Sequence, residues 1–264
     1  EDAFPSLRAV TGRAHINTMM DADGILRHHM LTLRLPDGEE IPSMALELAR
    51  RYRDYWGEEP VELPAVNGRG FWYLPYCGLP GDIEVRSVAE VLSGDIPAEY
   101  FAGKVVLVGP YATGLQDSYL TAIDHAKPMY GVEYHANAIQ ALLWGNYKVE
   151  AGRGVQLAVL FLLLLLALAG SWRRSVRVST GLWLALAGGW ILLARGLYEL
   201  GWVVRVLWVP AGATLIYGGC LAVNYIQAAA ERRQVTNTFK RYVAPEIVNE
   251  LLKEGSKALE LGGE

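Results

Sequence analysis

Five histidines are the side chains with the clearest capacity for metal or proton chemistry in this chain. They are His15, His28, His29, His125 and His135. The spacing that places two metal ligands on one face of a helix is absent from this set. We therefore expect the histidines to be structural or surface residues, and we expect no metal site in the chain.

Two short motifs resemble ligand-binding loops but lack the residues that would complete them. Asp21, Asp23 and Gly24 match the opening of a calcium loop, yet the later acidic positions are missing, so a turn is the better interpretation. The segment 109–114 has the glycine spacing of a phosphate loop without its Lys and Ser/Thr. No histidine is placed to activate Ser118 as a nucleophile, and we expect no catalytic residue in this chain.

Polar side chains gather at one predicted strand-to-helix connection. The apolar run 104–109 predicts a buried strand, residues 110–130 a long loop, and Gly131 to Trp144 a helix. Ligands of α/β folds bind beyond the carboxyl ends of the strands. The candidates for a sensory pocket are therefore Gln116, Asp117, Ser118, Glu133 and Asn137. The alternative is that these side chains cap helices and hold the loop in place.

The remaining signals before residue 150 alternate between strand and helix. Asp37-Gly38 predicts a turn, and Phe71 to Tyr73 is prone to form a strand. Ser43 opens one helix, and Ser87 caps another that ends at Gly94. On the helix 131–144, Val132, His135, Ile139 and Leu142 form an apolar stripe, while Glu133, Asn137 and Gln140 form a polar one. Residues 1–150 therefore read as a mixed α/β domain.

Three apolar stretches follow, at about residues 155–172, 178–194 and 206–228. A helix crosses a bilayer with about 20 apolar residues. The first and third stretches meet this length. The second is short and ends at Arg195, which leaves a re-entrant or buried helix as an alternative. Residues 151–228 are expected to form a three-span helical bundle in contact with membrane lipid.

The charges of the connecting loops set the expected orientation. The loop 171–177 carries three arginines and no acid, and four basic residues follow the third stretch. Because short loops rich in Lys and Arg stay in the cytoplasm, the α/β domain is expected outside and the C-terminus inside. The formal net charge of −4 gives no support for nucleic-acid binding.

Residues 229–264 are expected to form a cytoplasmic helical connector. Apolar residues recur along it, and Pro245 interrupts them, so we predict two helices with a kink. The chain begins and ends abruptly, and we expect it to be a piece of a longer protein. A parent that starts in the cytoplasm would need one more span before Glu1.

Several segments resemble the type-2 CHASE domain, an extracytoplasmic sensor of bacterial signalling receptors. In the family's order they are 12–17, 21–27, 42–46, 103–109, 114–117 and 129–139. The resemblance covers about residues 1–150. It implies a receptor of the bacterial inner membrane that works as a homodimer and senses an unknown extracytoplasmic ligand.

The connector resembles the segment that joins membrane sensors to class III nucleotide cyclase domains. The residues that carry this likeness are Phe239, Arg241, Tyr242, Pro245 and Glu246, and 261–264 resemble the start of the first cyclase strand. The resemblance implies the receptor portion of an adenylate cyclase that makes cyclic AMP from ATP, with GTP as the alternative substrate. The catalytic domain, with two Asp residues that hold Mg or Mn, would follow Glu264. This chain itself would hold no cofactor and would not be an enzyme. The alternatives are a histidine or Ser/Thr kinase output, or a membrane-anchored partner-binding scaffold.

Overall fold

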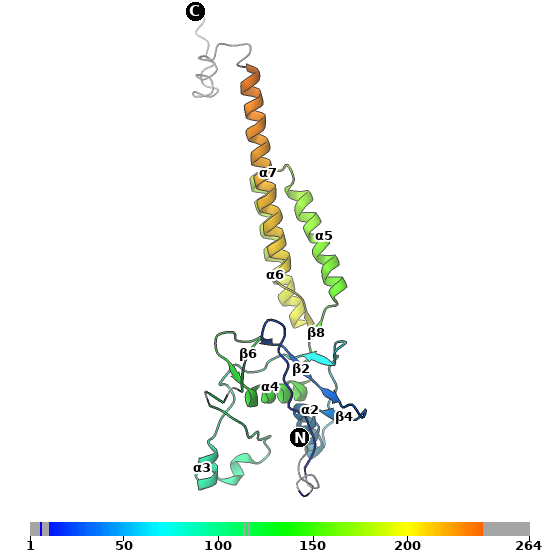
Figure 1. The fold of residues 1–264 in the computed structure, drawn as a ribbon, viewed down its shortest axis with the longest axis vertical. Helices are drawn as coiled ribbons and strands as arrows, with labels where there is room; N and C mark the ends of the chain where they lie inside the picture. Colours follow the sequence, from blue (N-terminus) through cyan, green and yellow to red (C-terminus); the bar gives the residue numbers. More distant parts are fainter. Residues whose placement is uncertain (1–5, 7–10, 113, 116, 240–264) are drawn as a thin grey trace, which may run out of the picture. The chain divides into compact units, whose positions relative to one another are not determined.

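The computed structural model describes residues 6, 11–112, 114–115 and 117–239. The chain divides into two compact units, which are described separately (Figure 1). The first unit, called the sensor unit below, comprises residues 1–150 and, after a long excursion of the chain, 197–203. The second unit, called the helical unit, comprises 151–196 and 204–264.

The sensor unit is built from several small sheets. β1 (Ile25–Leu26) pairs in parallel with β6 (Ser118–Thr121), and β6 pairs antiparallel with β7 (Met129–Tyr130). β2 (His28–Met30) pairs antiparallel with β5 (Phe71–Tyr73). β3 (Thr32–Arg34) and β4 (Glu40–Pro42) form a hairpin around the predicted Asp37-Gly38 turn, where Gly38 has a φ of 89°. A fourth pair joins β8 (Val149–Glu150) to β9 (Trp202–Val203) in parallel.

The predicted helix starts after Ser43 and Ser87, the end at Gly94 and the helix 131–144 are confirmed. α2 (Met44–Trp56) is capped by the Ser43 hydroxyl, which accepts from the Leu46 N–H. α3 (Val88–Ser93) has the Ser87 capping box and ends at Gly94 in the left-handed conformation. A short 3₁₀ helix, η1 (Ala98–Phe101), follows it. α4 spans Gly131–Trp144 and packs against α2.

The predicted buried strand at 104–109 is wrong. In this segment Val105 and Leu107 pack against the core, while Val106 and Val108 are 51% and 84% exposed. Its side chains therefore alternate as in a strand, but it pairs with no other strand in the described part of the chain. The position beside β1 is occupied by β6. The expected loop 110–130 correspondingly contains β6 and β7.

One core holds the sensor unit together. Leu26 of β1, Trp72 of β5 and Tyr134 of α4 are fully buried, and Leu46 and Ala49 of α2 pack against the same cluster. The two-stripe prediction for α4 is wrong in part, because Glu133 and Asn137 are also buried. Both side chains satisfy their polar atoms by hydrogen bonds to loop backbone, which removes the cost of burial.

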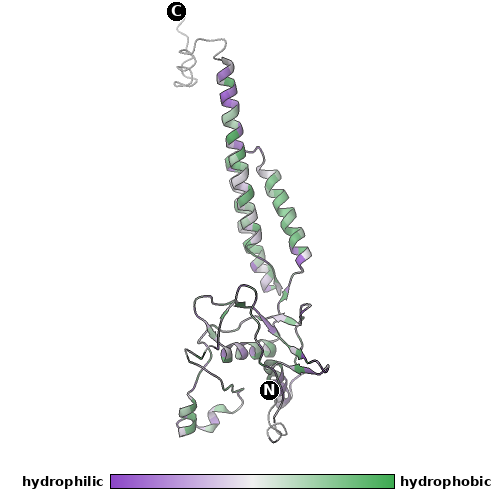
Figure 2. Cartoon of the chain, viewed as in Figure 1, coloured by the Kyte–Doolittle hydropathy of each residue, from purple (hydrophilic) through white to green (hydrophobic). Residues whose placement is uncertain are grey.

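The helical unit contains three helices long and apolar enough to cross a membrane. They are α5 (Arg153–Ser171), α6 (Val176–Glu199) and α7 (Trp208–Phe239). Figure 2 shows the apolar residues along them and the polar C-terminal part of α7. α6 has 24 residues and continues past Arg195, so it is not the short element that the sequence suggested. The first residues of the expected connector are the continuation of α7.

Close packing within the helical unit depends on small residues. A Cβ on Gly212 of α7 would lie 2.7 Å from Leu164 of α5, so glycine permits this approach. Gly188 and Gly189, by contrast, face open space. α6 contacts α7 through a hydrogen bond of 2.9 Å from the Trp183 indole to the Thr214 hydroxyl.

Candidate functional site

The predicted sensory residue Asn137 holds a loop in place. Its Oδ1 accepts hydrogen bonds of 2.9 Å from the backbone N–H groups of both Cys77 and Gly78. Its Nδ2 donates to the carbonyl of Glu133, and the side chain is fully buried. The side-chain oxygen therefore holds the backbone of Cys77 and Gly78 against α4, while the amide nitrogen is satisfied within the helix.

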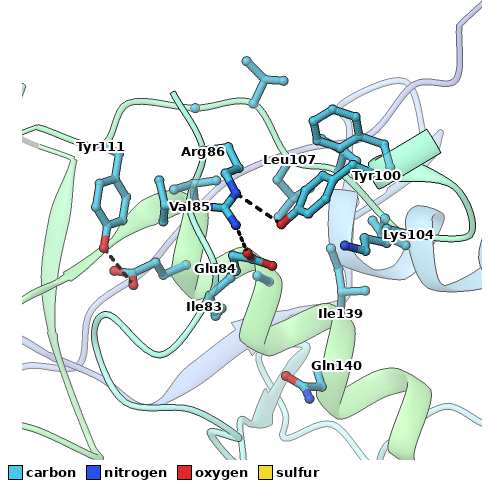
Figure 3. Close-up of a pocket in the computed structure, with 18 of the residues that line it drawn as sticks. Ile83, Glu84, Val85, Arg86, Tyr100, Lys104, Leu107, Tyr111, Ile139 and Gln140 are labelled. Carbon is cyan, nitrogen blue, oxygen red and sulfur yellow. Dashed lines mark hydrogen bonds and ion pairs between the residues drawn. The ribbon is translucent and has the colours of Figure 1, made fainter. Parts of the chain in front are cut away.

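Glu133 has a similar place but also borders a cavity. Its carboxylate accepts from the N–H groups of Gly81 (2.7 Å) and Tyr130 (3.1 Å) and from the Tyr111 hydroxyl (3.4 Å). Among the predicted sensory-pocket residues that the structure describes, Glu133 alone lines a cavity beside α4. Figure 3 labels Tyr111 and marks the hydrogen bond of its hydroxyl with a dashed line.

Asp117 and Ser118 lie beside the start of α4. The Asp117 carbonyl accepts from the Gly131 N–H, and a Cβ at Gly131 would lie 2.3 Å from the Asp117 carboxylate, so glycine is required there. Ser118 is exposed at the start of β6 rather than in a loop. Gln116 lies outside the described residues. Of the connector set, Phe239 ends α7, while Arg241, Tyr242, Pro245 and Glu246 lie outside the described residues.

The cavity has a volume of about 800 Å³ and lies over one side of α4. Its walls are the segments 83–88 and 103–109 together with α3 and η1. Aliphatic side chains dominate the lining, among them Ile83, Val85, Val91, Leu107 and Ile139. This volume falls within the range of small-molecule sites, about 300–1,000 Å³. The cavity is thus large enough and apolar enough to bind a small ligand.

Charged groups stand at one part of this cavity. Arg86 forms an ion pair with Glu84 and donates to the Tyr100 hydroxyl at 3.3 Å. The Lys104 ammonium lies 3.7 Å from the centroid of the Tyr100 ring (Figure 3). The Tyr100 hydroxyl and the two cations lower the pKa of Glu84, which keeps this carboxylate ionised. Two cations and one anion therefore give this part of the cavity a net positive charge.

Three histidines that are distant in sequence meet in the core. His15, His29 and His135 are buried, and the ring centroids of His29 and His135 are 6.1 Å apart. Burial, with the neighbouring histidines, lowers the pKa of His29 to about 3 and that of His135 to about 4. The described residues contain no group of His, Cys, Asp and Glu arranged to hold a metal ion. The cluster is instead a set of neutral imidazoles.

The end of the sensor domain pairs with the segment between the second and third apolar helices. The Val149 N–H donates to the Gly201 carbonyl at 2.8 Å, at the start of the β8–β9 pair. Lys148 is 5% exposed, and its ammonium lies 4.9 Å from the centroid of the Tyr198 ring. β8 leads through residues 151–152 into α5, and β9 leads through 204–207 into α7. This pairing, called the junction below, joins the sensor core to both helices along the chain.

His28 attaches the junction to the sensor core. Its Nε2 lies 3.1 Å from the Glu150 carboxylate, and its Nδ1 lies 2.9 Å from that of Asp21. The hydrogen bonds to Glu150 and Asp21 raise the pKa of His28 above its usual value, although burial opposes the shift. Arg27 bonds the other Asp21 oxygen and Asp23, and the Tyr73 ring packs edge-on against His28. The imidazolium is therefore favoured here, in contrast to the buried histidines.

The fold and these sites define a membrane protein in which a mixed α/β sensor-type domain precedes three apolar helices. The family model of the CHASE2 domain matches residues 3–171. The chain belongs to the CHASE2 family, whose domain is an extracellular sensor of signalling receptors. No curated protein and no solved structure matches the chain.

Neither the cavity charges nor the junction could be predicted directly from the sequence. Arg86 and Lys104 are eighteen positions apart and belong to segments without regular structure. The pairing of residue 149 with residue 202 crosses two apolar helices, a separation that periodicity does not reveal. The β-prone pair Trp202-Val203 between the second and third apolar helices is a weak signal for a strand.

Proposed function

We propose that this chain is the receptor portion of a class III adenylate cyclase. In this proposal the sensor unit faces the extracytoplasmic side of a bacterial inner membrane and α5, α6 and α7 span the membrane. A catalytic domain after Glu264 converts ATP to cyclic AMP. The cyclase part rests on the likeness of the segment 239–248 to cyclase connectors. The expected Mg or Mn ions would be bound by that catalytic domain.

The observation that carries the receptor proposal is the membership of 197–203 in the sensor unit. Two crossings, by α5 and α6, return this segment to the side of the membrane that holds residues 1–150, as the proposal requires. The arginine-rich loop at 172–177 then falls on the opposite side, in agreement with the preference of basic loops for the cytoplasm.

The junction provides a route for the signal. A change in the sensor core reaches β9 through its pairing with β8, and β9 is continuous with α7, the helix that leads to the connector. A ligand drives such a change only if it binds one arrangement better than the other. In a homodimer, a displacement of the paired α7 helices would alter the alignment of two catalytic domains.

Reading the coding sequence past Glu264 and assaying the complete protein in membranes tests the output. We expect cyclic AMP from ATP, lost when the downstream metal-binding Asp residues are replaced. Cyclic GMP from GTP would change the substrate, and a kinase domain without cyclic nucleotide formation would contradict the cyclase. Crosslinking in the same membranes should give dimers, whereas monomers with full activity would contradict the homodimer.

The orientation has its own test. In a background with Cys77→Ala and Cys220→Ala, Ser175→Cys lies between α5 and α6, and Ser93→Cys lies at the exposed end of α3. A membrane-impermeant thiol reagent added to intact spheroplasts should label the second variant and not the first. Labelling of Ser175→Cys without permeabilisation would reverse the orientation.

A further inference from the structure

The charged side chains around the cavity differ in whether they already form hydrogen bonds or ion pairs within the protein. The Glu133 carboxylate accepts two backbone N–H bonds and the Tyr111 hydroxyl, and the Arg86 guanidinium pairs with Glu84. Lys104 contacts the face of Tyr100 and forms no ion pair with any described carboxylate. Lys104 is therefore the cavity cation whose charge is not matched by a direct partner.

The walls of the cavity select against a wholly polar ligand. Val85, Leu107 and Ile139 come from three separate segments and line the same space. Removing apolar ligand surface from water here is favourable by about 25 cal/mol per Å². A sugar or a dication would lose its hydration and find few polar partners on these walls.

One wall is also free to adapt. The segment 104–109 is extended and unpaired with any strand in the described ranges, and Val106 and Val108 on its outer side are exposed. Segments with few buried contacts and no ladder hydrogen bonds lie at the low-stability end of a fold. Occupation of the cavity would order this wall against α4, which gives the ligand a differential affinity for one arrangement.

We propose that the cavity binds a small amphipathic carboxylate, an apolar chain with one anionic head. The carboxylate pairs with Lys104 beside Tyr100, and the chain lies along Leu107 and Ile139. This rests on the receptor function proposed above and names the chemical class of its ligand. A neutral apolar molecule fills the same walls but forms no ion pair with Lys104, and Lys104 and Arg86 would disfavour a cationic head beside Tyr100.

The probe for this proposal is octanoate with a photoreactive diazirine near its chain end, and 1-octanol with the same group is the neutral match. The chain 1–264 in lipid nanodiscs is irradiated at increasing probe concentration, and labelled peptides are mapped by mass spectrometry. We expect saturable octanoate labelling on the segment 105–108 or on α4. Octanol should require up to about fivefold higher concentration, because the ion pair with the exposed Lys104 is lost.

Two variants separate the charge from the fold. Lys104→Ala should weaken octanoate labelling up to about fivefold and leave octanol labelling unchanged, whereas Lys104→Arg should retain octanoate labelling. Equal labelling by both probes in the parent chain, no effect of Lys104→Ala, or labelling confined to α5, α6 and α7 would each overturn the proposal. The assay requires no catalytic output, so saturable cavity labelling in a protein that makes no cyclic nucleotide would retain this site and reject the cyclase.

Discussion

His28 and His29 are adjacent in sequence but have opposite electrostatic surroundings. His28 lies between two carboxylates, which raise its pKa, while burial beside two other imidazoles lowers the pKa of His29. The difference follows from the alternation of β2, which directs one ring toward the junction and the other into the core. From sequence spacing alone, both histidines are expected to be structural or surface residues.

The buried histidines predict acid lability of the sensor core. Their pKa values are about 3 and 4 for His29 and His135 in the folded state, against 6.5 when exposed. Their neutral forms therefore contribute stability above pH 6.5 that is lost as the pH falls towards these values. We expect hydrogen-exchange protection of α4 in nanodiscs, corrected for intrinsic rates, to decrease between pH 6.5 and 4.5.

The matched variant for this prediction is His135→Gln, which removes one titrating group. Hydrogen-exchange protection of α4 in this variant should be lower than in the parent chain at pH 7.5. The free energy of opening should also depend less on pH than in the parent chain, by about 1.4 kcal/mol per pH unit below pH 6.5. A pH dependence identical to that of the parent chain would show that His135 is not the group responsible.

His28 predicts the opposite response at the junction. Because its pKa is raised in the folded state, the stability it contributes is present below pH 6.5 and is lost as the pH rises through the raised value. Protection of the β8 amides should therefore fall up to about fivefold on the alkaline side, the size of a partly exposed ion pair. His28→Gln should abolish this step, and the exposed His125→Gln should preserve it. A step that persists in His28→Gln would contradict the assignment.

Asn137 predicts a structural rather than a ligand-contact phenotype. Asn137→Ala leaves the N–H groups of Cys77 and Gly78 without their acceptor, at a cost of about 2 to 4 kcal/mol. Thermal unfolding followed by circular dichroism should show a clear loss of stability. Gln140→Ala, on the same helix and without a hydrogen bond to described residues, should be nearly neutral. Equal effects of the two variants would contradict this role.

At the scale of elements, local signals predicted helices better than strands. Ser43, Ser87 and Gly94 fixed helix ends because caps act within one turn. The run 104–109 has the composition of a buried strand, yet β6 takes the place beside β1. Strand pairing depends on partners far away in sequence, which composition does not identify.

The candidate site was predicted only in part for the same reason. Glu133 was named as a sensory residue from its place on the helix, and it does line the cavity. Lys104 and Arg86 were not named, since only the folded chain brings segments 83–88 and 103–109 together over α4.

The turn before β9 predicts the sensitivity of the junction. Gly201 has a φ of 91°, and its carbonyl accepts from Val149. Gly201→Ala should destabilise the β8–β9 pair by about 1 to 2 kcal/mol, because a side chain is unfavourable in the left-handed region. Exchange of the β8 and β9 amides should accelerate accordingly. Gly196→Ala, in α6 with open space around it, should leave these amides unchanged. Equal exchange in both variants would contradict the importance of this turn.

In the whole molecule, one connection leads from the sensor unit to the C-terminal part of the chain. The sensor unit includes a segment from between two spans, and the third helix leads from that segment toward the connector. Length and composition predicted the three apolar helices, whereas the return of 197–203 to the sensor unit followed only from the fold.

The most direct measurement joins residues 1–264 to a class III adenylate cyclase catalytic domain and follows cyclic AMP formation in membranes. Val149→Cys with Trp202→Cys places two thiols at paired positions of the junction, in a background with Cys77→Ala and Cys220→Ala. The single Val149→Cys variant is the control. Oxidation of the double variant should change cyclic AMP formation about fivefold or more, the size of a typical coupling between sites. Equal activity in the oxidised and reduced double variant, with the disulfide verified, would contradict transmission through the junction.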